Sequence, residues 1–411
     1  MLESGDCTAV QVAQACLERV QARDADVKAW AYIDPDAVLE QARVRDREAR
    51  RGPLHGIPVG VKDIMHTFDM PTEYASPIYR GNRTREDAAC VAMLRDAGCV
   101  IMGKTETMEF AVYNPARTHN PHNLAHTPGG SSSGSAAATA DFMVPLALGT
   151  QTGGSIIRPA SYCGVVGYKP SYRLINRAGV KAVSDSLDTV GVLARTVGDA
   201  ALIASALIGW KGVDLYSDSD QLRIGLCRSP AGKFAEAATL AAVEETAARL
   251  GNARCSIREV VLSGPFDRAL DAQASVNLYE ARRSLSFERI NHPEQISKVL
   301  TARFEQGEKI RLYDYLAAQA VLSECRERLA EVFEEVDVLI EPSSTGEAPR
   351  GLENPGDSAF NRMWTALHVP CVSLPVLRGP SGLPLGLQVI GPINSDKITV
   401  QVADQIAMRL Q

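Results

Sequence analysis

The chain has 411 residues, 45% of them hydrophobic and 22% charged, and its formal net charge at pH 7 is −6. The acidic balance excludes a basic surface for nucleic acid or anionic membranes, and no stretch reaches the ~18 apolar residues of a membrane-spanning helix or resembles a secretory leader. The nine cysteines are an odd number without a Cys-x-x-Cys pair, so we expect free thiols in a reducing cytoplasm.

The first part of the chain alternates between helix and strand patterns. Thr8 and Gln11 match a capping box at the start of a helix whose apolar residues recur every four positions. Further elements are expected in this order: a helix over 36–51, an alternating strand over 57–64, a helix over 86–97, an apolar strand over 99–102, a helix over 105–112, a loop over 113–130, a helix over 135–140 and a strand over 143–149.

The rest of the chain continues the alternation. Strands are expected at 223–227 and 256–262 around a helix over 235–250, followed by a helical stretch over 268–335, a strand over 336–340, two strands within 370–392 and a terminal helix. This order predicts an α/β layered fold with a largely parallel or mixed sheet. Without a repeat or linker, we expect one domain over 1–411, with N-terminal helices at about 1–52 and a core at about 53–200.

Two motifs suggest ligand sites that their contexts disfavour. Residues 98–105 match the phosphate-loop pattern, but the expected loop is itself a strand, so Lys104 is interpreted as a surface or structural lysine. His119, His122 and His126 have ligand-like spacing on a proline-broken loop, which favours a solvated loop over a zinc site. No metal or cofactor is expected.

Two serine-rich turns and a strand lysine are candidates for chemistry. A serine hydroxyl needs a base, and a buried lysine with a lowered pKa serves where no histidine stands out. Lys62 lies opposite the apolar face of its strand and fits this role, although it is equally compatible with an ion pair to Asp63. Residues 153–155 suit an oxyanion hole or a tight turn, and residues 131–133 suit catalysis or a helix N-cap.

Several motifs together resemble the amidase signature family over most of the chain. They are GIPVGVKD at 56–63, GGSSSGSAAA at 129–138, GTQTGGS at 149–155, SLDTVG at 186–191, VDVLIEP at 336–342 and GLPLGLQVIG at 382–391. The resemblance implies an α/β fold in which a single large mixed β-sheet is sandwiched between layers of helices. It also implies hydrolysis of an amide C–N bond through an acyl-enzyme.

The resemblance also implies roles for individual residues. Ser155 is at the nucleophile position, Ser131 at the bridging serine whose peptide bond is cis, and Lys62 at the base. Backbone N–H groups of Thr152, Gly153, Gly154 and Ser155 are expected to hold the oxyanion. Gly130 is expected to contact substrate, while Thr150 and Ser132 support the hydrogen-bond network.

Two departures from the family pattern bear on the substrate. Gln151 stands where members usually have aspartate, and the usual arginine two residues after the nucleophile is replaced by Ile157. An arginine follows instead at Arg158, where it either enters the pocket and binds a carboxylate bidentately or packs against an acidic neighbour.

The expected substrate is therefore a small carboxylate-bearing amide such as malonamate, with hydroxylamine as a further acyl acceptor. The alternatives are an amidase for aryl, fatty or peptide amides, and a glutaminase-type subunit of an amidotransferase complex. We expect a small-molecule partner, no nucleic acid, no membrane and a cytoplasmic location, and a homodimer is left open.

Overall fold

The computed structural model describes residues 2–112, 114–211, 215 and 222–410. In these residues eleven strands form one sheet in the order β1-β3-β2-β4-β6-β5-β10-β11-β9-β7-β8. The strands are β1 (Trp30–Ile33), β2 (Pro58–Lys62), β3 (Val100–Thr105), β4 (Leu146–Gln151), β5 (Val166–Lys169), β6 (Thr189–Ala194), β7 (Arg223–Arg228), β8 (Ser256–Val261), β9 (Val338–Pro342), β10 (Cys371–Arg378) and β11 (Pro384–Ile390). β2 runs parallel to β3 and β4, and β7 runs parallel to β8 and β9. The central pairs from β4 to β9 are antiparallel, which confirms a mixed sheet.

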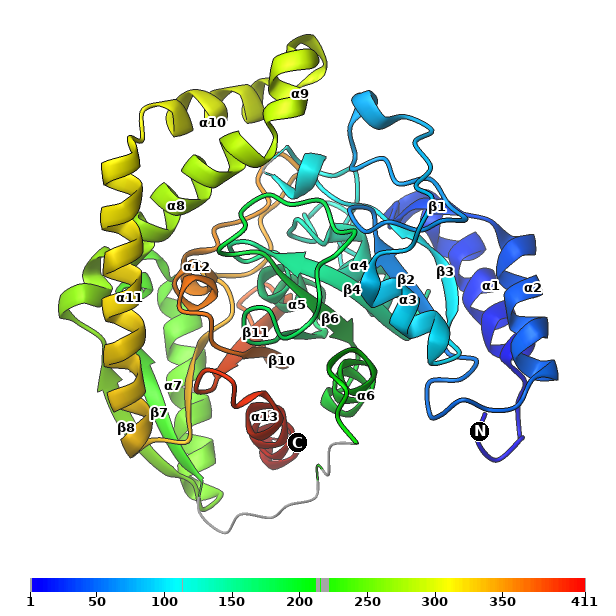
Figure 1. Ribbon diagram of the computed structural model, residues 1–411. Helices are drawn as coiled ribbons and strands as arrows, with labels where there is room; N and C mark the ends of the chain where they lie inside the picture. Colours follow the sequence, from blue (N-terminus) through cyan, green and yellow to red (C-terminus); the bar gives the residue numbers. More distant parts are fainter. Residues whose placement is uncertain (1, 113, 212–214, 216–221, 411) are drawn as a thin grey trace.

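Helices cover both faces of this sheet. They are α1 (Ala9–Val27), α2 (Pro35–Arg47), α3 (Ala89–Asp96), α4 (Ser133–Ala140), α5 (Ile157–Cys163), α6 (Val197–Ile208), α7 (Ala237–Asn252), α8 (Ala269–Ser284), α9 (Ser286–Asn291), α10 (Lys298–Glu308), α11 (Leu312–Glu335), α12 (Ala359–Ala366) and α13 (Asp396–Leu410). Figure 1 shows α1 and α2 at one end of the molecule, α8 to α11 at the other, and α4 and α5 near the centre. This arrangement confirms the α/β fold with a large mixed sheet between helical layers.

Side-chain alternation along the strands divides the core between the two faces. On β3, Val100 and Met102 pack in the cluster that contains α1, α2 and α4 residues, whereas Ile101 packs with residues of α3. Both faces are buried, so strands such as β3 carry apolar side chains on both sides, as is usual for parallel strands under helices. The capping box of Thr8 and Gln11 at the start of α1 is confirmed.

One helix expected from the sequence is wrong, and the expected helical stretch over 268–335 is present as several helices. The region 105–112 holds only a single 3-10 turn, at Glu109–Ala111. β3 continues to Thr105, and the left-handed φ values of Phe110 (46°) and Ala111 (60°) are incompatible with an α-helix. The stretch 268–335 is divided into α8, α9, α10 and α11, with Pro293 beginning a short 3-10 turn between α9 and α10.

Other expectations differ only in their boundaries. The strand expected at 143–149 begins at Leu146, directly after Pro145, which has no N–H to donate to a neighbouring strand.

All nine cysteines are free, as expected. Among the described residues, no helix combines the length and apolarity needed to cross a bilayer.

Candidate active site

Three segments converge where β2 and β4 end side by side. These strands are parallel neighbours, so their carboxyl ends lie at the same edge of the sheet, and Lys62 and Thr150 stand near those ends. The serine-rich turn before α4 approaches the same edge, since the Ser132 hydroxyl donates to the Thr150 carbonyl at 3.3 Å and accepts from the Thr150 N–H at 3.3 Å. Ser132 and Thr150 therefore join the turn to the strand.

Lys62 lies at the centre of this edge with none of its surface exposed. Its Nζ donates to Ser131 Oγ at 2.7 Å and to Thr150 Oγ1 at 2.9 Å. Burial lowers the pKa of Lys62 well below its usual value, and the negative charge of Asp188 opposes that change only in part. Because the lowered pKa favours the unprotonated amine, Lys62 is suited to accept a proton from a hydroxyl.

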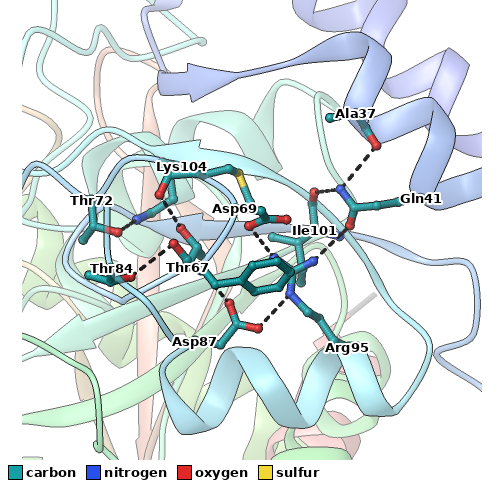
Figure 2. A network of polar contacts seen from close by, with 12 residues as sticks. Ala37, Gln41, Thr67, Asp69, Thr72, Thr84, Asp87, Arg95, Ile101 and Lys104 are labelled. Carbon is teal, nitrogen blue, oxygen red and sulfur yellow. Dashed lines mark hydrogen bonds and ion pairs between the residues drawn. The ribbon is translucent and has the colours of Figure 1, made fainter. Parts of the chain in front are cut away.

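The alternative ion pair between Lys62 and Asp63 does not form. Successive side chains of a strand point to opposite faces, and Asp63 instead pairs with Lys104 Nζ at 3.0 Å. Lys104 is fully buried and also donates to Thr72 Oγ1 at 2.6 Å, which Figure 2 shows beside the ion pairs of Arg95 with Asp69 and Asp87. Lys104 is thus a structural lysine and not a surface one, within a strand and not a phosphate loop.

Ser131 and Ser155 line the same pocket from different turns. The Gly130–Ser131 peptide bond is cis, as the family resemblance implies. The Ser132 N–H donates to the Ser155 carbonyl at 3.3 Å and ties the two turns together. No hydrogen bond joins the two hydroxyls in the described structure, so Lys62 contacts Ser131 directly, and Ser155 shares the pocket with Ser131.

The turn from Thr152 to Ser155 is fixed through its carbonyl groups. Gln273 Nε2 donates to the Thr152 carbonyl at 3.1 Å, and Thr365 Oγ1 donates to the Gly153 carbonyl at 2.6 Å. The Gly154 carbonyl accepts from the Arg158 N–H at 2.9 Å. A trans peptide directs its N–H away from its C=O, so these contacts also fix the direction of the N–H groups that follow. Thr152, Gly153 and Gly154 all line the pocket, as an oxyanion hole requires.

The side chain of Thr152 is held from a different direction. Its hydroxyl donates to Asp188 Oδ1 at 2.6 Å, and Asp188 Oδ2 accepts the N–H groups of Val183 and Ser184. Burial raises the pKa of Asp188, while these hydrogen bonds act in the opposite direction. Asp188 therefore connects the turn 152–155 to the segment before β6, and its negative charge acts on Lys62.

Arg158 lies three residues after Ser155, in the first helical turn of α5, and is only 4% exposed. Its Nη1 donates to the Gly356 carbonyl at 2.5 Å and its Nη2 to the Gly130 carbonyl at 2.6 Å. Arg158 also lines the pocket that contains Ser155. Gly130 thus contacts Arg158 through its carbonyl, and the guanidinium is oriented before any substrate arrives.

The side-chain amide of Gln151 both accepts and donates hydrogen bonds, whereas an ionised carboxylate could only accept them. Its Oε1 accepts the N–H groups of Ile156 at 2.8 Å and Ile157 at 3.0 Å, where α5 begins. Its Nε2 donates to Thr365 Oγ1 at 2.9 Å. The residue therefore caps α5 and contacts α12 without placing a negative charge beside the pocket.

The pocket includes residues that no sequence pattern indicated. Asn277 comes from α8, Arg303 from α10, and Ser358 and Arg362 from α12 and the turn before it. Arg362 lies 3.6 Å from Asp357, and its aliphatic chain faces Gly153. No local motif marks these residues, because they are far from residues 129–158 in the sequence.

The histidine loop has no metal-binding arrangement. His119 contacts the Leu124 carbonyl, His122 the Cys163 carbonyl and His126 the Ala348 carbonyl. No group of three potential metal ligands occurs in the described part of the chain.

Comparisons with known proteins agree with this geometry. The Amidase family model matches residues 11–400. The chain is 32% identical to a glutamyl-tRNA(Gln) amidotransferase subunit from Microcystis aeruginosa, covering 94% of this chain and 91% of that protein, and 35% identical to its counterpart in Anaeromyxobacter sp., covering 93% and 89%. A crystal structure of an amidase superposes with a TM-score of 0.92 at 30% identity, covering 100% of this chain and 98% of the other. The peptide amidase of Stenotrophomonas maltophilia superposes with a TM-score of 0.82 at 28% identity, covering 99% and 94%.

Proposed function

The chain belongs to the amidase family and is an amide-hydrolysing enzyme, and from this we propose that it cleaves a small carboxylate-bearing amide, malonamate, to malonate and ammonia. This would make it a malonamidase. The observation that carries the proposal is the contact of the buried Lys62 amine with the Ser131 hydroxyl, together with the pocket that Ser131 lines with Ser155 and Arg158.

We propose that the three residues act as a proton relay. Neutral Lys62 accepts the proton of Ser131 while Ser131 accepts the proton of Ser155, and Ser155 Oγ attacks the amide carbonyl. Hydrogen bonds between catalytic groups are often long before substrate binds, so the Ser131–Ser155 contact would close in the complex. Thr150, the second partner of Lys62, would hold the amine toward Ser131.

The remaining steps follow from the same arrangement. N–H groups of the turn 152–155 would stabilise the tetrahedral oxyanion. The C–N bond then breaks as Ser131 returns its proton to the nitrogen, which leaves as ammonia. Water attacks the acyl-enzyme through the same relay, which releases the acid and restores Ser155. Hydroxylamine in place of water would give the hydroxamate.

Arg158 is proposed to bind the substrate carboxylate. Its side chain lines the pocket, and the contacts to the Gly356 and Gly130 carbonyls hold the plane of the guanidinium. Because the planar group is already oriented, less entropy is lost when a carboxylate binds. One methylene between the carboxylate and the amide carbon, as in malonamate, fits the short distance along the chain from Ser155 to Arg158.

The test compares two arginines of one pocket. R158Q should reduce kcat/KM for malonamate by about 30-fold or more, since a hydrogen-bonded charge pair is worth about 2–5 kcal/mol, and should reduce the turnover of a neutral amide such as propionamide far less. R362Q is the matched control, because Arg362 lines the same pocket but already faces Asp357. Equal losses on both substrates in R158Q would contradict the carboxylate role.

A second candidate function is a glutaminase-type subunit, favoured by the names of the amidotransferase relatives. It predicts that the purified chain alone hydrolyses amides poorly and that a partner raises glutamine hydrolysis. Malonamate hydrolysis by the isolated chain, without glutamine hydrolysis, would favour the malonamidase.

A further inference from the structure

We infer that Thr365 is a positioning residue for the oxyanion hole and that the amide of Gln151 sets the direction of its hydroxyl proton. This inference rests on the proposed function of the 152–155 turn. It assigns a role to Gln151, the residue that departs from the family pattern, and to a threonine on α12 that no motif marks.

The orientation of the Gln151 amide follows from its partners. Two backbone N–H groups, those of Ile156 and Ile157, lie at 2.8 and 3.0 Å from Oε1, so that atom must be the acceptor. The other atom is then the NH₂ group, which can only donate, and it faces Thr365 Oγ1 at 2.9 Å. The threonine oxygen is thereby the acceptor of this bond.

The proton of Thr365 is consequently available to a carbonyl. Its Oγ1 lies 2.6 Å from the Gly153 carbonyl and 3.0 Å from that of Asn361, one helical turn earlier. The shorter contact is to Gly153, and it fixes the peptide plane between Gly153 and Gly154. Since the Gly154 N–H points opposite to that carbonyl, Thr365 aims it at the position of the oxyanion.

An ionised glutamate at position 151, which reaches as far as the glutamine, would reverse this order. It accepts hydrogen bonds only, so the oxygen facing Thr365 would take the hydroxyl proton and leave two oxygens 2.6 Å apart without a hydrogen between them. Thr365 is only 1% exposed and Gln151 equally so, and the peptide would have to rotate. The isosteric variant Q151E makes this change with little change of shape.

The experiment uses T365A, T365S, Q151E and the double variant Q151E/T365A. Removing one oxyanion donor costs about 100- to 1,000-fold in kcat, so misaligning one of several should cost about 10- to 100-fold. We expect this loss in T365A and in Q151E, with KM changed by less than about threefold, and near wild-type kcat in T365S, which keeps the hydroxyl. T365A should also keep the pH profile of kcat/KM, because Lys62 is untouched.

The double variant separates hydroxyl direction from added charge. If Q151E acts through the hydroxyl, it should change kcat by less than about threefold in the T365A background. A wild-type kcat in T365A, or an equal Q151E effect in both backgrounds, would overturn the inference.

All variants are assayed with malonamate and with p-nitrophenyl acetate, using S155A as the blank. If wild type does not hydrolyse malonamate but Ser155-dependent ester cleavage is present, the proposed substrate fails while the role of Thr365 is still measured. Urea denaturation of each variant checks that lost activity does not come from unfolding.

Discussion

Two fully buried lysines on neighbouring strands are expected to differ in how much the free energy of unfolding changes when each is replaced by methionine. Lys104 is paired with Asp63 at 3.0 Å, so K104M leaves a buried carboxylate without its cation, which costs about 3–5 kcal/mol of unfolding free energy. Lys62 instead contacts two hydroxyls, and burial already lowers its pKa. K62M loses two hydrogen bonds of about 1 kcal/mol each but no longer buries an amine, so the net change at pH 7 should lie within about 1 kcal/mol of zero.

The pH dependence gives a further check on Lys62. Its pKa is lower in the folded state, so the unfolded chain binds the proton more readily below the usual lysine pKa of about 10.4. Wild type should therefore gain stability relative to K62M as pH rises from 7 toward that value, by at most about 1.4 kcal/mol per pH unit.

Urea denaturation followed by circular dichroism measures both variants, and amide hydrolysis is measured per folded molecule. K62M should be folded and inactive, whereas K104M should be less stable but active where folded. A K62M protein as destabilised as K104M at pH 7, or one whose stability relative to wild type is independent of pH, would refute the reasoning.

Three further outcomes are expected from single substitutions. D188N removes the charge that favours protonated Lys62, so the acid limb of the kcat/KM profile should move to lower pH, and a shift to higher pH would contradict this. G154A places a Cβ 2.4 Å from Asn361 Oδ1 and should lower the free energy of unfolding, measured by urea denaturation, by about 1–3 kcal/mol. G153A should be nearly neutral, because the nearest atom to its Cβ is Arg362 Cγ at 3.5 Å. Equal losses of stability in the two variants would argue against close packing at Gly154. Burial raises the pKa of Glu341 to about 8, so wild type should lose thermal stability relative to E341Q as pH rises from about 4.5 through 8, and a pH-independent difference would disprove it.

The parts of the site that sequence reasoning could predict are those encoded by neighbouring residues. The ends of β2 and β4, the turn before α4 and the turn at 152–155 all show local glycine, serine and apolar patterns. The structure brings the two turns to one pocket, and hydrogen bonds from Lys62 and Thr150 join the strand ends to the turn before α4. The catalytic roles assigned to these residues remain predictions.

The parts that could not be predicted depend on contacts between distant segments. The partner of Lys104 is decided by the register of β2 against β3, and a single sequence does not give that register. Gln273 on α8 and Thr365 on α12 bind carbonyl groups of the turn 152–155. Nothing in the sequence around either residue distinguishes it from other buried helix residues. The helix expected at 105–112 failed for a related reason, since left-handed residues such as Phe110 are held by tertiary packing and not by local preference.

Every residue of α5, the helix that follows Ser155, is buried. A segment without a solvent-facing side tolerates few changes, so sequence variation next to Ser155 has little room there. The wall formed by Asn277, Arg303 and Arg362 belongs to α8, α10 and α12, where these three side chains are only partly buried. Directed evolution of new amide preferences should therefore begin with libraries at those three positions, where the recognition of a substrate can be altered while the bond-breaking apparatus is left as it is.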